Sequence, residues 1–217
     1  MNDKPSIKNK SLKYDMLAEM FNIGVGKSAS LLSEIIGRKI LLDVSKIEIL
    51  CNKDKNEKLE AILSKISDGA LMVSSIEFEE KITGKANLIF PTNKMRTFIN
   101  LCMNQEIDNC GGEINFTDID FDVIKEIGNI VLNSIMGEIG NFLDVSLNYS
   151  LPQVEIFDRK SFKSGIENTG WSCIIMLYIS FTIDGTEVRG AIIINLTLNS
   201  LNELLRIIDK MEEDLYE

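Results

Sequence analysis

The stretch DVIKEIGNI at residues 122–130 decides how this chain is organised, and it has a counterpart in DMLAEMFNI at residues 15–23. In each stretch an Asp is followed four residues later by a Glu, and the Glu is followed three residues later by an Asn. Because each residue of an α-helix turns by about 100°, steps of four and three keep these side chains on one face. Each stretch therefore predicts a helix with a strip of two carboxylates and one carboxamide, about 60° wide.

The first strip consists of Asp15, Glu19 and Asn22, and the second strip consists of Asp122, Glu126 and Asn129. Small or polar residues continue the strips, namely Gly26, Ser30 and Ser33 in the first and Asn133, Gly137 and Gly140 in the second. The opposite sides are apolar, with Leu17, Met20, Leu31 and Ile35 on the first helix and Ile124, Ile127, Val131 and Phe142 on the second. Each helix is expected to bury its apolar side and to turn its strip to solvent or to a partner.

The composition is that of a soluble protein with a sizeable core. The chain has 217 residues, 45% of them hydrophobic, and a net charge of −10 from 33 acidic and 23 basic residues. This charge argues against a nucleic-acid binder, because phosphate contacts need clustered Lys and Arg. The polar start lacks the apolar segment of a secretory signal, and no apolar run is long enough to cross a bilayer. We expect a cytoplasmic protein without membrane insertion.

Cysteine and histidine usage narrows the possible chemistry. The four cysteines Cys51, Cys102, Cys110 and Cys173 form no CxxC pair, and we expect them to be buried free thiols in a reducing compartment. The chain has no histidine, which excludes His-based acid–base catalysis and the common zinc sites. We expect no cofactor or metal of its own.

The two halves of the sequence predict the same order of secondary-structure elements. The first half predicts a helix over 11–36, a strand over 40–51, a charged loop with a short helix near 59–66, a hairpin over 70–79 and 82–90, and a helix over 94–103. A linker over 104–117 leads to a helix over 118–142, a strand over 145–156, a loop over 158–170, a hairpin over 171–183 and 187–196, and a helix from 199 to 211.

A shift of 107 residues aligns the strips, and a shift of 106 aligns Gly84 with Gly190 and Asn93 with Asn199. One near-constant register over helix, strands and helix indicates an internal duplication.

This repeat predicts the fold class and the domain organisation. We expect an α+β domain over residues 11–211, made of two helix–three strands–helix repeats (11–103 and 118–211) related by a pseudo-twofold axis. Neither half covers its own sheet readily, so the halves should join in a mainly antiparallel six-stranded sheet under the long helices. Residues 1–10 should form a flexible arm and residues 212–217 a tail.

Two residue patterns do not fit this scheme directly. Glu138 falls on the apolar side of its helix, where the first helix has Leu31, so it should snorkel to an edge or pair with a Lys or Arg. The segment Gly24 to Ser28 looks like the end of a phosphate-binding loop, but Phe21 stands where that motif needs a glycine. The segment also lies inside a helical pattern rather than after a strand, which argues against nucleotide binding.

The strips themselves suggest a limited kind of chemistry. A neutral carboxamide is no general base, but beside a carboxylate it can orient a water molecule or a phosphoryl oxygen. Such positioning matters most in phosphoryl transfer, where the protein does little covalent chemistry. The phosphoryl group and its metal would then arrive with the substrate. The plain alternative is that each strip is simply a solvated helix face.

The paired D-x3-E-x2-N helices, with IGNI in the second and NIG in the first, resemble the CheC/CheX/FliY family of chemotaxis phosphatases over about residues 11–211. The two-copy layout is most like CheC. In that family the motif is followed some twenty-odd residues later by a proline. Pro152 fits this spacing after the second strip, whereas Ser45 stands at the corresponding place after the first.

The resemblance implies hydrolysis of the aspartyl phosphate on a CheY-type response regulator. Asn129 and Asn22 would orient the attacking water, and Glu126 and Glu19 would pair with a lysine of the regulator. The metal would be Mg²⁺ held by the regulator, and CheD is a further expected partner. Two alternatives stay open at this point, a non-catalytic adaptor that binds a response regulator or CheD, and a flagellar-switch-associated protein.

Overall fold

The computed structural model describes residues 7–51, 53–105 and 115–214, which form six helices and seven strands. The helices are α1 (Ile7–Ile36), α2 (Lys53–Ile66), α3 (Thr92–Cys102), α4 (Asp118–Leu143), α5 (Arg159–Asn168) and α6 (Leu198–Asp214). The strands are β1 (Ile40–Cys51), β2 (Leu71–Glu79), β3 (Gly84–Pro91), β4 (Asn148–Tyr149), β5 (Gln153–Phe157), β6 (Cys173–Ile183) and β7 (Thr186–Leu196). All of these strands join one sheet through antiparallel pairs. The expected α+β class is confirmed.

The order of the strands interleaves the two halves of the chain. It is β1-β6-β7-β3-β2-β4, and β5 also pairs with β2. The first strand of the first half, β1, therefore lies against β6 of the second half, and β4 and β5 lie against β2 of the first half. This order reads the same when the halves are exchanged, so both halves are needed to complete the sheet. The origin of the halves by duplication stays a prediction.

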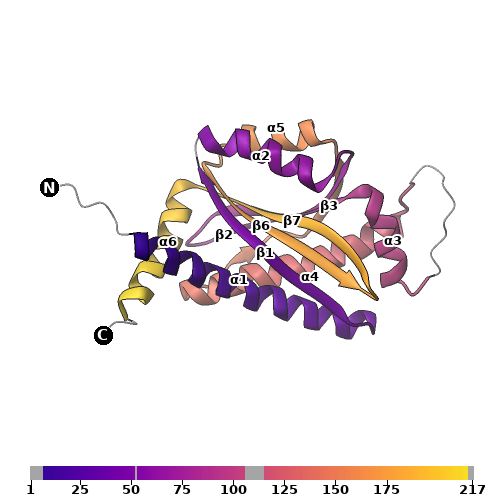
Figure 1. The fold of residues 1–217 in the computed structure, drawn as a ribbon, viewed down its shortest axis with the longest axis horizontal. Helices are drawn as coiled ribbons and strands as arrows, with labels where there is room; N and C mark the ends of the chain where they lie inside the picture. Colours follow the sequence, from indigo (N-terminus) through magenta and orange to yellow (C-terminus); the bar gives the residue numbers. More distant parts are fainter. Residues whose placement is uncertain (1–6, 52, 106–114, 215–217) are drawn as a thin grey trace.

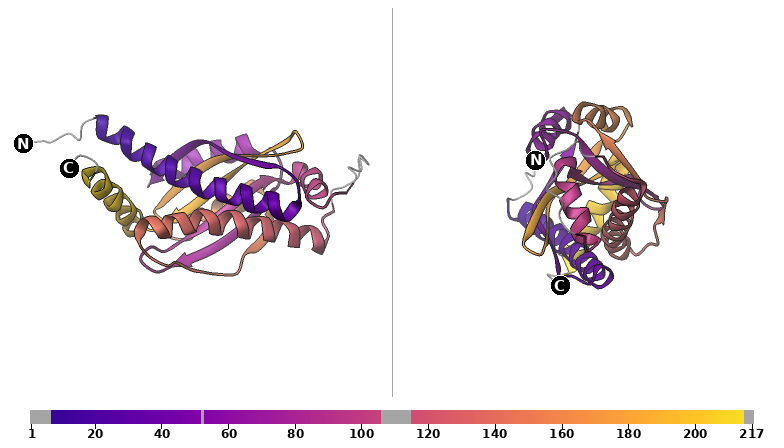
Figure 2. Two further views of the ribbon diagram at one scale, coloured as in Figure 1. Left: turned by 90° about the horizontal axis from the view of Figure 1, so that it is seen from below. Right: turned by 90° about the vertical axis from the view of Figure 1, so that its right-hand side faces the viewer.

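Helices cover both faces of the sheet (Figure 1). The helices α1 and α4 lie side by side on one face and run in opposite directions, as the view from below in Figure 2 shows. The larger core lies beneath them and includes the mutually contacting rings of Phe90, Phe98 and Phe181. On the opposite face, α2 and α5 enclose a smaller core around residues such as Leu63 and Phe162. The strips lie on the side of α1 and α4 that faces away from the sheet.

Most expected boundaries agree with the structure to within a few residues. The strand expected over 40–51 is β1, and both hairpins are present as β2–β3 and β6–β7. The β6–β7 turn places Asp184 and Gly185 at φ 47° and 78°, the left-handed values that a tight hairpin turn requires. The first helix begins at Ile7, so residues 7–10 of the expected arm are helical, and residues 1–6 lie outside the described ranges. Within the described ranges, no helix has the length and apolar character needed to cross a membrane.

The strand expected over 145–156 is divided into β4 and β5. Pro152 lacks a backbone N–H and cannot continue the ladder with β2. Ser150 holds the edge in place next to it, because its backbone N–H donates to the carbonyl of Glu77 (2.9 Å) and its Oγ accepts from the Glu77 N–H (2.9 Å). The prediction of six strands therefore becomes seven, with Leu151 and Pro152 forming a projection between β4 and β5.

The loop expected over 158–170 is wrong, because most of it is the helix α5. Asp158 caps this helix, accepting hydrogen bonds from the backbone N–H groups of Lys160 (2.9 Å) and Ser161 (3.0 Å). Phe162 and Ile166, four residues apart, turn the same face to the sheet and are both 5% exposed. The Asp158 cap and the spacing of Phe162 and Ile166 are the sequence signals for this helix, whereas the Ser164-Gly165 pair is typical of a loop.

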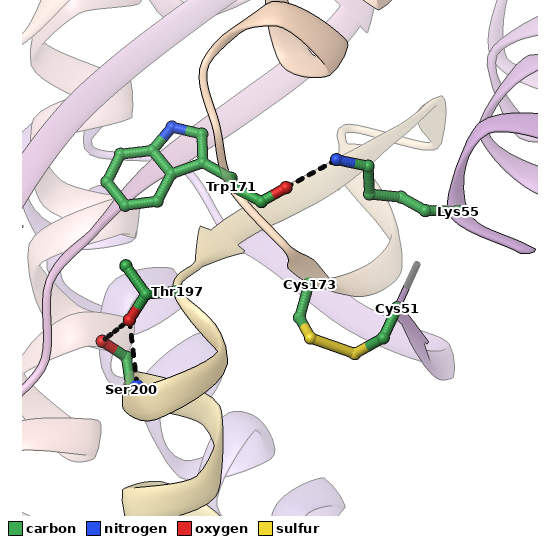
Figure 3. The surroundings of a disulfide bond; sticks show 6 residues. All are labelled: Cys51, Lys55, Trp171, Cys173, Thr197 and Ser200. Carbon is green, nitrogen blue, oxygen red and sulfur yellow. Dashed lines mark hydrogen bonds between the residues drawn. A yellow bond between two sulfur atoms is a disulfide. The ribbon is translucent and has the colours of Figure 1, made fainter. Parts of the chain in front are cut away.

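The expectation that all four cysteines are free thiols is also wrong. Cys51 at the end of β1 and Cys173 at the start of β6 form a disulfide (Figure 3). The sheet register sets these residues directly opposite each other although 122 positions separate them in the sequence. The register of two distant strands is not readable from composition, so the pairing was missed. Cys102 is a free buried thiol whose pKa burial raises to about 12, and Cys110 lies outside the described residues.

Candidate functional site

The first strip lies on the solvent side of α1. Asp15, Glu19 and Asn22 are all exposed. Leu17 and Met20, on the other side of the helix, are only 1% and 4% exposed and pack into the larger core. Glu19 and Asn22 have no hydrogen bond or ion pair with any residue that the structure describes. Their polar groups are therefore free to meet a partner.

The second strip lies in the same way on α4. Asp122 and Glu126 are exposed and Asn129 is half-buried, whereas Ile124 and Ile127 on the other side are buried. The carboxylate of Glu126, like that of Glu19, has no partner among the described residues. Across the described part of the chain, no three His, Cys, Asp or Glu side chains gather as a metal-binding group. Both strips therefore present a free carboxylate and a carboxamide to solvent.

The apolar side of α1 differs from expectation in its second half. Leu31 and Ile35 were expected to be buried, but they are 47% and 63% exposed. Leu32 takes the buried position instead, at 1% exposed. The buried stripe therefore shifts around α1, a helix that packs against both α4 and β1. A single helical period read from the sequence does not describe a helix with two neighbours.

Close packing and one ion pair join the two helices. An ideal Cβ on Gly24 would lie 2.9 Å from the Cα of Ile135, so α1 approaches the backbone of α4 where a side chain would not fit. Lys27 pairs with Glu138 across this seam, which confirms that Glu138 finds a basic partner. The segment from Gly24 to Ser28 lies within α1, in agreement with the argument against a phosphate-binding loop.

The carboxamides of the two strips differ in their surroundings. Asn133, one turn after Asn129, donates a hydrogen bond from Nδ2 to Oδ1 of Asn129 at 2.7 Å. In the first helix the residue four positions after Asn22 is Gly26, where an ideal Cβ would have nothing within 4 Å. The sequence shows two carboxamides, Asn129 and Asn133, at a helical spacing of four, but this spacing alone indicates only that Asn133 continues the strip.

A hollow lies beside the first turn of each strip. The hollow beside the second strip has a volume of about 450 Å³ and is lined by Phe121, Glu155 and Pro152 among others. The hollow beside the first strip has a volume of about 400 Å³ and includes Tyr14 and Glu48. Phe121 and Glu155 follow Tyr14 and Glu48 by 107 positions, so the hollows share equivalent residues, although Lys58 and Ile62 of α2 also line the first.

The edge of the second hollow carries a proline and an exposed leucine. Pro152 lines this hollow together with Asp122 and Lys125 of α4, and the neighbouring Leu151 is 84% exposed. At the corresponding place after the first strip, Ser45 is the extra residue of a bulge in β1, and its Oγ donates to the carbonyl of Tyr178 (3.4 Å). The second strip therefore has an apolar projection beside it, whereas the first strip has a paired strand.

The start of α4 is fixed by a buried carboxylate. Asp120, 3% exposed, accepts from the backbone N–H of Thr117 (2.6 Å) in a capping box and pairs with Arg96 of α3 (2.8 Å). Burial opposes the ionisation of Asp120, but the hydrogen bonds from Thr117 and the Arg96 guanidinium outweigh it and hold the pKa of this carboxyl below its usual value. The strip that begins two residues later is therefore carried on a fixed helix end.

Comparison with known proteins gives relatives for both sequence and fold. The chain is 25% identical over 150 residues to the CheY-P phosphatase CheC of Bacillus subtilis (strain 168), and the match covers 68% of each chain. The crystal structure of FliY from Thermotoga maritima matches 97% of this chain and 99% of its own, with a TM-score of 0.67 and 20% identity. The FliM middle domain from H. pylori matches 91% of this chain and 98% of its own, with a TM-score of 0.58 and 13% identity. No family model matches the sequence.

Proposed function

The chain belongs to the CheC/CheX/FliY family, and from this premise we propose that it is a phosphatase of a phosphorylated CheY-type response regulator. The observation that carries the proposal is the pair of outward-facing carboxylate–carboxamide strips on α1 and α4. In each strip the carboxylate has no partner within the described ranges. A phosphorylated protein that docks on either helix would meet an acid and an amide held one helical turn apart.

The proposed reaction is the hydrolysis of an aspartyl phosphate on the regulator. The oxygen of a water molecule forms a bond to phosphorus, and the bond between phosphorus and the acyl oxygen breaks. The regulator regains its carboxylate together with the electron pair of that bond, and inorganic phosphate and one proton are released. Asn129 or Asn22 orients the attacking water through the oxygen and nitrogen of its side-chain amide. An acyl phosphate is already labile, so orientation and the exclusion of bulk water supply a useful rate gain.

The carboxylates of the strips have a separate role in this proposal. Glu126 and Glu19 would pair with a lysine of the regulator and hold the complex in register. Because each carboxylate stands one turn before its Asn, the ion pair fixes the position of the amide relative to the phosphoryl group. The metal in the proposed complex is Mg²⁺ bound by the regulator, and this chain's residues contribute an ion pair, hydrogen bonds and the positioning of water.

Decay of a phosphorylated CheY-type regulator, measured as phosphate release with and without this protein, tests the proposal. The wild-type chain should accelerate release, and Asn22→Ala/Asn129→Ala together should abolish the acceleration. Asn202→Ala, which removes an exposed carboxamide from α6, is the matched control and should leave the rate unchanged. Full activity in the folded double variant would end the assignment of both strips as catalytic.

A non-catalytic adaptor is the second candidate function. Ser45 occupies the place of the motif proline after the first strip. Because the first strip lacks this part of the family motif, it would bind a regulator or CheD without turnover. The same experiment separates the two functions if binding is measured alongside. Binding of the phosphorylated regulator with an unchanged rate of phosphate release would favour the adaptor.

A further inference from the structure

The hydrogen bond between Asn133 and Asn129 has a chemical consequence for the second strip. A side-chain amide can turn over about its last torsion and exchange the places of its oxygen and its nitrogen. The bond from Asn133 Nδ2 occupies one lone pair of Asn129 Oδ1 at 2.7 Å and thereby fixes which way the amide faces. A second lone pair on Oδ1 and both Nδ2 protons remain free for water and for a phosphoryl oxygen.

The burial of the two residues supports a fixed arrangement. Asn129 is half-buried and Asn133 is half-buried, and Oδ1 of Asn133 is shielded from solvent. The donor therefore reaches Asn129 from a side chain whose other end is enclosed by the protein. Asn22 in the first strip is exposed, has no partner in the described part of the chain, and is followed one turn later by Gly26. Its amide is free to turn over.

We propose that Asn133 is a positioning residue that holds the Asn129 carboxamide in its reactive orientation, and that this contact makes the second strip the faster of the two hydrolytic sites. The inference rests on the proposed function. Asn133 does not touch the reacting atoms, and it acts through Asn129. The first strip lacks this contact because Gly26 supplies no side chain.

Two substitutions of Asn133 test the contact. Asn133→Ala removes the donor and should lower kcat about tenfold while KM stays within about twofold, because binding through Glu126 is retained. Asn133→Asp keeps the size of the side chain but only accepts hydrogen bonds, so it should turn the Asn129 amide over and lower kcat as much as Asn133→Ala. An Asn133→Asp variant with wild-type kcat would overturn the proposal, because the donor would then be unnecessary.

The reciprocal substitution tests the same contact in the first strip. Gly26→Asn places a carboxamide one turn after Asn22, at a position with open space around its Cβ. In an Asn129→Ala background, where only the first strip is intact, this change should raise kcat about threefold. Gly26→Ala is the matched control, since it adds a Cβ without a donor and should leave kcat unchanged. Equal kcat values for the two variants would contradict the proposal.

A measurement that needs no activity separates this inference from the proposed function. The side-chain NH₂ signal of Asn129, identified by its loss in Asn129→Ala, should have an order parameter in the rigid range in the wild-type chain. In Asn133→Ala the order parameter should fall below about 0.6. An unchanged order parameter would overturn the positioning role even if the phosphatase activity is established. A wild-type chain that does not accelerate phosphate release would instead overturn the proposed function, and with it the difference in rate between the strips.

Discussion

The helices α1 and α4 carry the same three polar residues at the same spacing, yet their surroundings differ. The second strip has a hydrogen bond between carboxamides, a projecting Leu151-Pro152 edge beside it and a helix start fixed by Asp120. The first strip has Gly26 in place of the second carboxamide and a bulge at Ser45 in place of the proline. The difference teaches that a repeated surface motif does not by itself give two equal sites, because the contacts around the motif decide how well its groups are held.

The largest expected effect comes from removing each carboxamide separately. Asn129→Ala should lower the rate of phosphate release about 100-fold, because the loss of one positioned hydrogen-bonding group in a hydrolytic site has an effect of this size. Asn22→Ala should lower the rate less than about threefold, because the first strip contributes little when the second is intact. The measurement is phosphate release from the phosphorylated regulator at saturating substrate. Equal losses in the two variants would break the comparison.

The two helices should also differ in how they tolerate an added methyl group. An ideal Cβ on Gly128 would lie 2.0 Å from Oγ and 2.5 Å from Cβ of Ser74 on β2. Gly128→Ala should therefore lower the free energy of unfolding by about 1–3 kcal/mol. Gly26→Ala, in open space within α1, should raise it by up to about 1 kcal/mol. Urea denaturation checks both values, and a Gly128→Ala variant as stable as the wild type would contradict the close packing of α4 on the sheet.

The exposed Leu151 offers a test of binding at the second strip alone. Leu151→Ser should raise KM for the regulator about fivefold with little change in kcat, because docking beside Asp122 would bury part of this side chain. Ile35→Ser is the matched control, since Ile35 is also an exposed apolar residue, 63% exposed near the end of α1. It should leave KM unchanged. If both variants raise KM equally, Leu151 has no special place in docking.

The smallest expected effect concerns acid stability at the start of α4. The pKa of Asp120 is lower in the folded chain than its ordinary value of 3.8. Its contribution to stability is therefore present above pH 3.8 and is lost as the pH falls below that value. Asp120→Asn should reduce the loss of the free energy of unfolding below pH 3.8. Arg96→Met, which removes the guanidinium, should reduce this loss in part. The measurement is the free energy of unfolding against pH, and an unchanged slope in both variants would contradict the assigned pairing.

The sequence predicted the elements whose signals are local. The bounds of β1 and the turn at Asp184-Gly185 follow from residues within a few positions of each other. The outward placement of Glu19 and Glu126 follows from the helical period. The polar character of Glu138 on an apolar side left two outcomes open, snorkelling to an edge or pairing with a Lys or Arg, and only the structure identifies Lys27 as its partner.

The features that the sequence did not predict depend on distant neighbours. The exposure of Leu31 and Ile35 depends on how α1 lies against both β1 and α4. The disulfide depends on the register between β1 and β6, two strands from different halves. The break at Pro152 was visible in the sequence as a residue that a strand interior tolerates poorly, but the apolar residues around it favoured one continuous strand.

The exchange of strands between the halves also limits how the two strips can change. Because β1 completes the sheet beside β6, and β5 completes it beside β2, a chain truncated after its first half would leave strand edges open in both directions. A substitution in the first strip, by contrast, alters only an exposed helix face. The first half can therefore lose the polar residues of its strip and still be retained as the structural scaffold for the second.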